Sequence, residues 1–182
     1  MADSAWTLDA SDGELLVRTG VTGRAAKMGH RLTIAMKRWT ATVRWVGDKP
    51  VSAELVVDVN SLDVLRGEGG VKGLSAAEKT LVRSNALRSL EAGRFPEIRF
   101  TTGTIDKTDG GYRLTGTLKI HGKTQDREIE LRTDDLGDAW RMSGQATVRQ
   151  SDFGVKQYSL LMGSVKVADE VTVSFSAQHT KE

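Results

Sequence analysis

Three histidines, His30, His121 and His179, carry the side chains of this sequence best suited to bind a metal or transfer a proton. No two of them stand at the HxH or HxxxH spacing that places two imidazoles on one face of a strand or helix. Only a fold that brought His30 and His121 together could build such a site. The spacing therefore favours surface or hydrogen-bonded histidines, and we expect no metal and no cofactor.

Other reactive groups are scarce. The chain has no cysteine, which excludes disulfides, thiol catalysis and thiolate metal sites. No G-x-S-x-G motif supports a serine hydrolase of that class. The glycine-rich segment 67–73 (GEGGVKG) lacks the GKS or GKT ending of a phosphate-binding loop. We interpret it as a loop before a helix, and the pair Asp134 and Asp135 as a solvated turn rather than an acid/base pair.

The composition is that of an ordinary soluble protein. Of the 182 residues 38% are apolar, and 26 Lys and Arg balance 24 Asp and Glu to a formal charge of +2. So weak a charge gives no reason to expect nucleic acid or an anionic membrane as partner. No apolar run approaches the roughly 20 residues of a membrane span. The first ten residues lack the basic start and apolar run of a signal peptide, so we expect a cytoplasmic location.

Most of the chain alternates apolar and polar residues with period 2, which indicates strands with one buried face. Trp39, Val43 and Trp45, for example, share one face of a single run. Asp109-Gly110 is a candidate for a two-residue type I′ hairpin turn. The pattern predicts about ten strands, at residues 14–19, 31–36, 38–45, 53–59, 97–105, 113–120, 127–131, 139–148, 156–162 and 170–176.

One segment, at about residues 75–92, follows a helical period instead. Ser75 and Glu78 form a capping-box pattern, and Gly93 is placed to end the helix. Pro96 prevents the helix from resuming. We therefore predict one helical insertion, followed by a strand.

About ten short antiparallel strands favour a barrel or a sandwich, since closure removes exposed edges. An interior that can just hold a small ligand is reached at about eight strands. The predicted fold class is an all-β antiparallel barrel of about eight main strands, with the helix capping one end. We expect a single domain over residues 1–182.

Three motifs, in their order and spacing, resemble the YceI-like family of bacterial proteins. The first is FPEIRF at residues 95–100, the second is the hairpin GTLKIHGKT at residues 116–124, and the third is DFG at residues 152–154. The resemblance extends from about Trp6 to Ala177. Within it, Lys119 stands where the family usually has threonine, Gln150 where it has arginine, and SLEAGR replaces a phenylalanine-rich approach to the proline.

This resemblance implies a lipocalin-like β-barrel that binds a long amphiphilic lipid, without catalysis. Family ligands are polyisoprenoids, including quinones with isoprenoid tails. Such a ligand would lie in the interior, where its burial contributes roughly 0.8 kcal/mol per CH₂. The residues expected to line the ligand are Trp39, Val43, Trp45, Leu55, Val57, Leu87, Phe95, Phe100, Leu118, Phe153 and Tyr158.

Two alternatives stay open. The tryptophans and large aliphatic residues could fill the barrel and leave a structural or stress-related protein without a ligand. An enzyme acting on a lipid or quinone would need a buried titratable group, for which His30 or His121 is the candidate. An edge strand could also pair two barrels into a homodimer.

Overall fold

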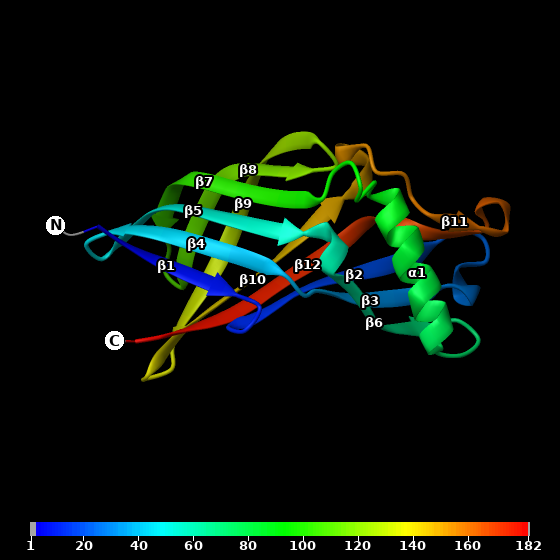
Figure 1. Cartoon of the computed structure of the whole chain (residues 1–182), viewed down its shortest axis with the longest axis horizontal. Coiled ribbons are helices and arrows are strands. Elements are labelled where there is room, and N and C mark those ends of the chain that lie inside the picture. Colours follow the sequence, from blue (N-terminus) through cyan, green and yellow to red (C-terminus); the bar gives the residue numbers. More distant parts are fainter. Residues whose placement is uncertain (1–2, 182) are drawn as a thin grey trace.

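The structure, a computed structural model, describes residues 3–181 and is almost entirely β-sheet (Figure 1). No helix among these residues is long and apolar enough to cross a membrane. The helix is α1 (Ala76–Ser89), and the strands are β1 (Asp3–Asp9), β2 (Gly13–Thr22), β3 (His30–Met36), β4 (Trp39–Val46), β5 (Lys49–Asp58), β6 (Leu62–Gly69), β7 (Glu97–Lys107), β8 (Gly111–Ile120), β9 (Lys123–Asp135), β10 (Ala139–Arg149), β11 (Ser159–Leu160) and β12 (Val165–Thr180).

The strands form one antiparallel sheet in the order β1-β4-β5-β7-β8-β9-β10-β12-β2-β3-β6, with β11 attached to β12. β3 runs into β4 through Lys37 and Arg38, and β5 runs into β6 through the 3-10 turn Val59–Ser61. β3 and β4 therefore form one long bent strand, and β5 and β6 form another. These two long strands pair with each other on both sides of the bend, β3 with β6 and β4 with β5. β4 stands near one end of the strand order, whereas β3 stands near the other end, where it pairs with β2. Since β3 continues into β4, the sheet curls back on itself.

The predicted antiparallel, lipocalin-like fold is confirmed, but the predicted number of about eight strands is wrong, since the sheet has twelve. The curled wall has eight long strands if β3–β4 and β5–β6 are each counted as one. The two bends divide these into four, and the short strands β1 and β11 bring the number to twelve. Within residues 3–181 β1 pairs with β4 alone, and its link to β12 is made by side chains: the Trp6 and His179 rings stack with centroids 3.9 Å apart.

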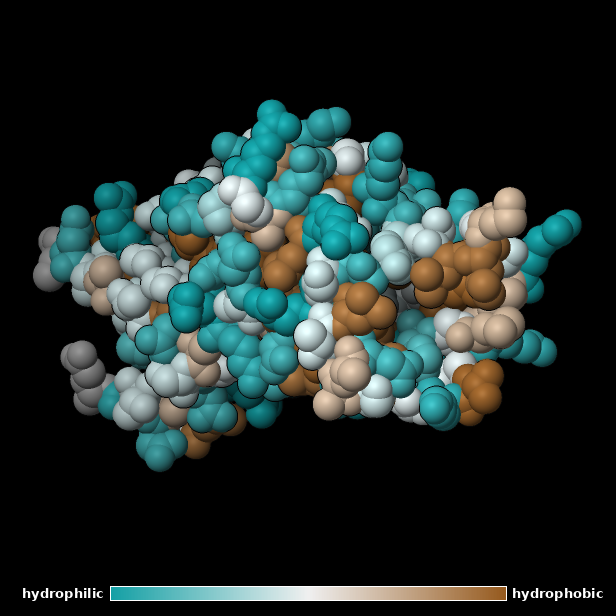
Figure 2. Space-filling view, turned by 45° about the vertical axis from the view of Figure 1, so that its right-hand side comes forward, coloured by the Kyte–Doolittle hydropathy of each residue, from teal (hydrophilic) through white to brown (hydrophobic). Residues whose placement is uncertain are grey.

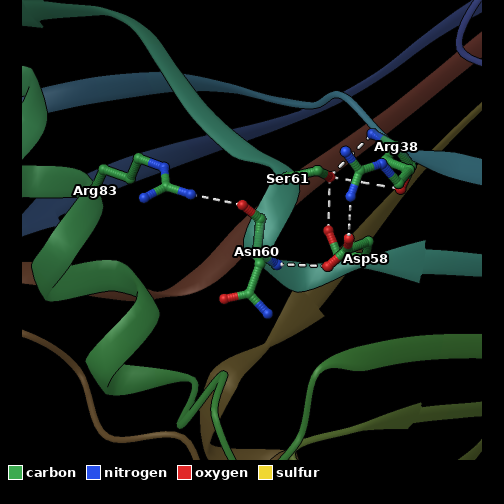
Figure 3. A network of polar contacts seen from close by, with 5 residues as sticks. All are labelled: Arg38, Asp58, Asn60, Ser61 and Arg83. Atoms are coloured by element: carbon green, nitrogen blue, oxygen red, sulfur yellow. Dashed lines mark hydrogen bonds and ion pairs between the residues drawn. The ribbon is translucent and has the colours of Figure 1, made fainter.

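A polar network fixes both bends and ties them to the helix (Figure 3). The Asp58 carboxylate accepts hydrogen bonds from the Asn60 N–H and from Arg38 Nη1, both at 2.9 Å. The Ser61 hydroxyl donates to the Asp58 carbonyl at 2.6 Å and accepts from the Arg38 N–H at 2.9 Å. From α1, Arg83 donates to the Asn60 carbonyl at 2.6 Å. The helix is therefore anchored where the two long strands change direction.

The N-terminus of α1 has the predicted capping box. The Ser75 hydroxyl accepts from the Glu78 N–H, and the Glu78 carboxylate accepts from the Ser75 N–H. Hydrogen bonding to the Ser75 backbone and hydroxyl lowers the pKa of Glu78. The half-buried residues Val82, Ala86 and Leu87 pack against the core beneath the helix. The helix thus covers one end of the barrel, as Figure 1 shows.

The C-terminus of α1 differs from the prediction, because the helix does not end at Gly93. Glu91 is the left-handed residue (φ 49°) of a Schellman motif in which the Ala92 N–H bonds to the Leu87 carbonyl. Glycine usually occupies this position because it adopts positive φ without strain. Here the Glu91 carboxylate contacts His121 Nε2, so the strained residue is tied to the barrel.

The predicted type I′ turn at Asp109-Gly110 is also wrong. The two-residue turn with two left-handed residues is His121-Gly122 (φ 55° and 74°), between the paired residues Ile120 and Lys123. β7 and β8 are joined by residues 108–110, and neither Asp109 nor Gly110 has the positive φ that a type I′ turn requires. The Thr108 N–H bonds to the Gly111 carbonyl across this turn, and the Gly110 carbonyl accepts from the Thr133 N–H of β9.

Three further differences concern the strands. β1 and β6 were not predicted, and of the predicted strand at residues 156–162 only Ser159 and Leu160 pair with a neighbour. The last strand is far longer than the predicted 170–176, because β12 pairs with β2 between Lys166 and Ala177 and with β10 between Glu170 and Thr180.

Candidate ligand-binding cavity

The curled sheet surrounds a cavity of about 820 Å³. The cavity extends to the β4–β5 turn, where Gly47 and Asp48 line it, and to the β7–β8 turn, where Thr108 and Gly110 do. In Figure 1 these turns lie at the end of the barrel opposite α1. None of the helix residues lines the cavity. The barrel is therefore covered at one end and hollow towards the other.

The wall of the cavity is built by the inward faces of consecutive strands. Residues at every second position of β5 (Ala53, Leu55 and Val57) face inward, as the period of a strand requires. The same alternation brings apolar residues from β1, β4, β7, β8, β9 and β10 to the interior. Among them are Trp6, Trp45, Phe100, Leu118, Ile129, Leu131, Trp140 and Met142.

Away from the β4–β5 and β7–β8 turns, the charged side chains of the wall are engaged with the protein. The Glu54 carboxylate pairs with Arg99 Nη1 at 2.9 Å, and the Arg127 guanidinium donates to the Thr147 carbonyl. Trp45 is different: its indole nitrogen is buried and has no hydrogen-bond partner among the described residues. Protein atoms cover this nitrogen, so it is not presented to the cavity as a donor. The wall of the cavity is mainly apolar.

Six of the eleven residues predicted to contact a ligand line this cavity. They come from four neighbouring strands of the sheet: Val43, Trp45, Leu55, Val57, Phe100 and Leu118.

The other five predicted residues lie elsewhere. Trp39 is only 2% exposed and packs edge-on against Phe175 with ring centroids 5.2 Å apart. Phe153 is buried in a separate cluster with Val148 and Val155. The remaining three lie in or near the helix. Leu87 of α1 packs against the core, Phe95 contacts the His121 ring, and the Tyr158 hydroxyl accepts from Asn85 Nδ2 of α1.

Several lining residues were missed. Ile129 and Leu131 alternate within a predicted strand, so the sequence carried a usable signal for them. Trp6 lies in β1, a strand defined only by its pairing with β4, and could not be found from the period alone. Trp140 and Met142 lie in one predicted strand, but nothing in the sequence distinguishes them from ordinary core residues.

The histidines do not come together. His30 Nε2 bonds to the Lys72 carbonyl at 2.6 Å, before the helix begins, whereas His121 contacts Glu91, after the helix ends. Within residues 3–181 no group of three or more metal-ligating side chains occurs. The groups with a resolved pKa shift are on the outer surface. The pKa of Asp135, for example, is lowered by the Lys181 ammonium and the Gly137 N–H.

The two positions that depart from the family pattern also lie outside the cavity lining. Lys119 is exposed on β8. The Gln150 side chain donates to the Ala168 carbonyl at 2.9 Å and so joins the 3-10 turn after β10 to β12.

Fold and cavity together define a barrel-type binding protein. The chain belongs to the YceI-like family, since the model of the YceI-like domain matches residues 6–179. The resemblance seen in the three sequence motifs is thereby confirmed. The family is one of binding proteins.

Solved structures share this fold at low sequence identity. BcnA from Burkholderia cenocepacia superposes with a TM-score of 0.72 at 21% identity, covering 95% of this chain and 99% of that chain. The YceI protein of Campylobacter jejuni gives a TM-score of 0.60 at 16% identity, covering 82% of this chain and 84% of that one. No curated protein matches the chain. At these identities the likeness concerns the fold alone.

Proposed function

We propose that this protein binds, without catalysis, a long apolar ligand in the barrel interior, with a polyisoprenoid or an isoprenoid quinone as the class of ligand. The observation that carries the proposal is the apolar cavity of about 820 Å³. Cavities of roughly 300–1,000 Å³ with apolar walls and few polar groups are typical of small-molecule sites. Family membership supports the same kind of function.

The energetics favour a chain-like ligand. Each CH₂ group that leaves water contributes roughly 0.8 kcal/mol, so three isoprene units supply several kcal/mol before the cost of ordering the ligand is subtracted. The wall offers no charged partner for a head group deep inside, because Glu54 and Arg127 are engaged. The polar end of the ligand would therefore lie towards the β4–β5 and β7–β8 turns.

The cavity counts against the alternative of a barrel filled by its own side chains. The tryptophans that could have filled the interior are divided: Trp39 is in the packed core, whereas Trp6 and Trp45 border empty space.

The test is a titration of intrinsic tryptophan fluorescence with an isoprenoid quinone. Quinones quench indoles at short range, and Trp6, Trp45 and Trp140 line the cavity. The proposal predicts saturable quenching that is abolished when a bulky residue blocks the cavity. Unsaturable quenching, equal in the blocked variant, would show that the quinone does not enter the barrel.

A further inference from the structure

Exposed large apolar side chains gather at the end of the molecule covered by α1. Seven of the eight that the described residues contain lie there, and only Leu136 lies at the mouth end. Figure 2 shows the corresponding hydrophobic surface, in brown, on its right-hand side. Scattered single apolar residues are normal on a soluble protein, whereas a gathered set marks an interaction site. The seven are Met28, Val71, Leu81, Tyr158, Leu160, Leu161 and Met162.

These residues belong to three loops and one helix face that contact one another. The Ala25 N–H donates to the Ser164 carbonyl at 2.8 Å, which joins loop 22–29 to loop 156–166. The contact of His30 with the Lys72 carbonyl brings loop 69–74 to the start of β3. Asn85 of α1 bonds to Tyr158 at 2.9 Å, and Leu81 stands one helical turn before Asn85 on the same face. We call this set of loops and the face of α1 the helix-end surface.

The most exposed part of the helix-end surface is held in an unusual backbone. Leu161, Met162 and Gly163 all have positive φ (51°, 57° and 88°). For residues other than glycine this conformation is strained, because Cβ lies too close to the following carbonyl oxygen. Leu161 is 58% exposed and Met162 is fully exposed, so the strain does not serve to bury them. A strained turn that projects two large apolar side chains outward is a feature of functional surfaces.

The charge of the three loops is one-sided. Segments 22–29, 69–74 and 156–166 contain five basic residues and no acidic one, although the whole chain carries only +2. Among the described residues none of the five forms an ion pair. The acidic residues next to segment 69–74 are both engaged, Glu68 by Arg66 at 3.5 Å and Glu78 in the capping box. The five are Arg24, Lys27, Lys72, Lys156 and Lys166, all exposed.

We propose that the helix-end surface docks onto an anionic lipid bilayer. Apolar side chains that project among unpaired Lys and Arg match such a surface, because the former enter the interface while the latter meet lipid phosphates. At the opposite end Asp48, Asp109 and Asp135 are accompanied by Lys49, Lys107 and Lys181, and Lys181 pairs with Asp135 at 2.6 Å. The unbalanced positive charge therefore lies at the α1 end, which orients the molecule with α1 towards the membrane. The proposal concerns a surface remote from the cavity mouth and does not depend on what the cavity binds.

The experiment measures co-sedimentation of the whole protein with vesicles of phosphatidylcholine alone or mixed with phosphatidylglycerol. Binding is expected only to the anionic vesicles, and it should weaken at high salt. Leu161→Asn together with Met162→Asn should reduce the partition coefficient at least tenfold; asparagine adopts positive φ more readily than most residues, so the turn is preserved. Leu136→Asn, at the other end, is the matched control and should have no effect.

The charge is tested in the same assay. Lys27→Gln with Lys72→Gln should lower the partition coefficient about 30-fold, at about 1 kcal/mol for each basic residue near the surface. Arg44→Gln with Lys49→Gln, exposed near the mouth, is the control. Failure of the unaltered protein to bind anionic vesicles, or equal binding by the Leu161 and Met162 variant, would overturn the proposal. So would sedimentation velocity showing that this surface instead joins two copies of the chain, with no vesicle binding.

Discussion

The two ends of this barrel are built from the same alternating strands but differ in how their interiors are filled. At the end covered by α1, side chains of the helix and of β3 and β6 interlock around Ile34, Leu62 and Val64, all at most 5% exposed. Towards the other end, the same kind of inward residues border a cavity of about 820 Å³. The helix is the difference. It supplies the side chains that close one end, and nothing equivalent enters the other.

Two tryptophans on one face of β4 allow this contrast to be measured. Trp39 is fully packed, whereas Trp45 lines the cavity and is only half-buried. Trp39→Ala should lower the free energy of unfolding by about 3–5 kcal/mol, because it leaves a new void in a dense core. Trp45→Ala should cost only about 1–2 kcal/mol, chiefly its packing against Trp6. Urea unfolding of both variants gives the comparison, and equal losses would contradict the assignment of packed and hollow ends.

The anchoring of the helix is tested at Arg83. Its guanidinium donates to the carbonyls of Asn60 and Leu62 at 2.6 and 2.8 Å. Arg83→Met keeps the length of the side chain and should lower the free energy of unfolding by about 2 kcal/mol, since two carbonyls lose a charged donor. Amide hydrogen exchange in β6 should accelerate with it. Arg88→Met, exposed on the same helix, is the control; if it matched Arg83→Met, the anchor would be unimportant.

The hollow end is tested by filling it. Ala146 lines the cavity, and its neighbour Thr147 is exposed on the outer face of β10. Ala146→Trp should weaken the binding of an isoprenoid quinone at least tenfold, which is about 1.4 kcal/mol. Thr147→Trp adds the same side chain on the outside and should bind as the unaltered protein does. The fluorescence titration distinguishes the two variants. If Ala146→Trp left the affinity for the quinone unchanged, the ligand would bind elsewhere.

The smallest effect concerns the turn after β10. The Ser151 hydroxyl and N–H both donate to the Asp169 carboxylate, which lowers the pKa of Asp169 below its ordinary value of 3.8. Between the lowered pKa and that ordinary value the unfolded chain binds more protons, so stability falls as the pH falls through this window. Asp169→Asn should therefore cost about 1 kcal/mol at neutral pH and less at pH values below the folded pKa. Urea unfolding at several pH values checks this, and a pH-independent difference would exclude the carboxylate as its source.

The strands and the helix were largely predictable because their signals are local. Alternation at residues 39–45 and a capping box at Ser75 and Glu78 depend on neighbours in the sequence. β1, by contrast, is a strand because β4 lies beside it, and Glu91 adopts positive φ in contact with His121 from a distant turn. Features of this kind depend on tertiary contacts and leave no local pattern.

The cavity was predictable only in part for a related reason. Alternation identifies an inward face, as for Val43 and Trp39, but not how far along the barrel that face meets other side chains. Trp39 is enclosed by the core, where Phe175 packs against it, whereas Val43 borders the cavity. The helix-end surface was hidden as well, since a total charge of +2 does not show where on the molecule the unpaired basic residues gather.

The most direct test of the account is native mass spectrometry of the gently purified protein, followed by organic extraction and mass analysis of what is released. We predict a stoichiometric co-purifying isoprenoid or other long-chain lipid in the unaltered protein and in the Thr147→Trp variant, and its loss from Ala146→Trp. A protein that is empty, and that also fails to take up added isoprenoid quinone, would contradict the claim that the hollow end of the barrel is a ligand-binding site.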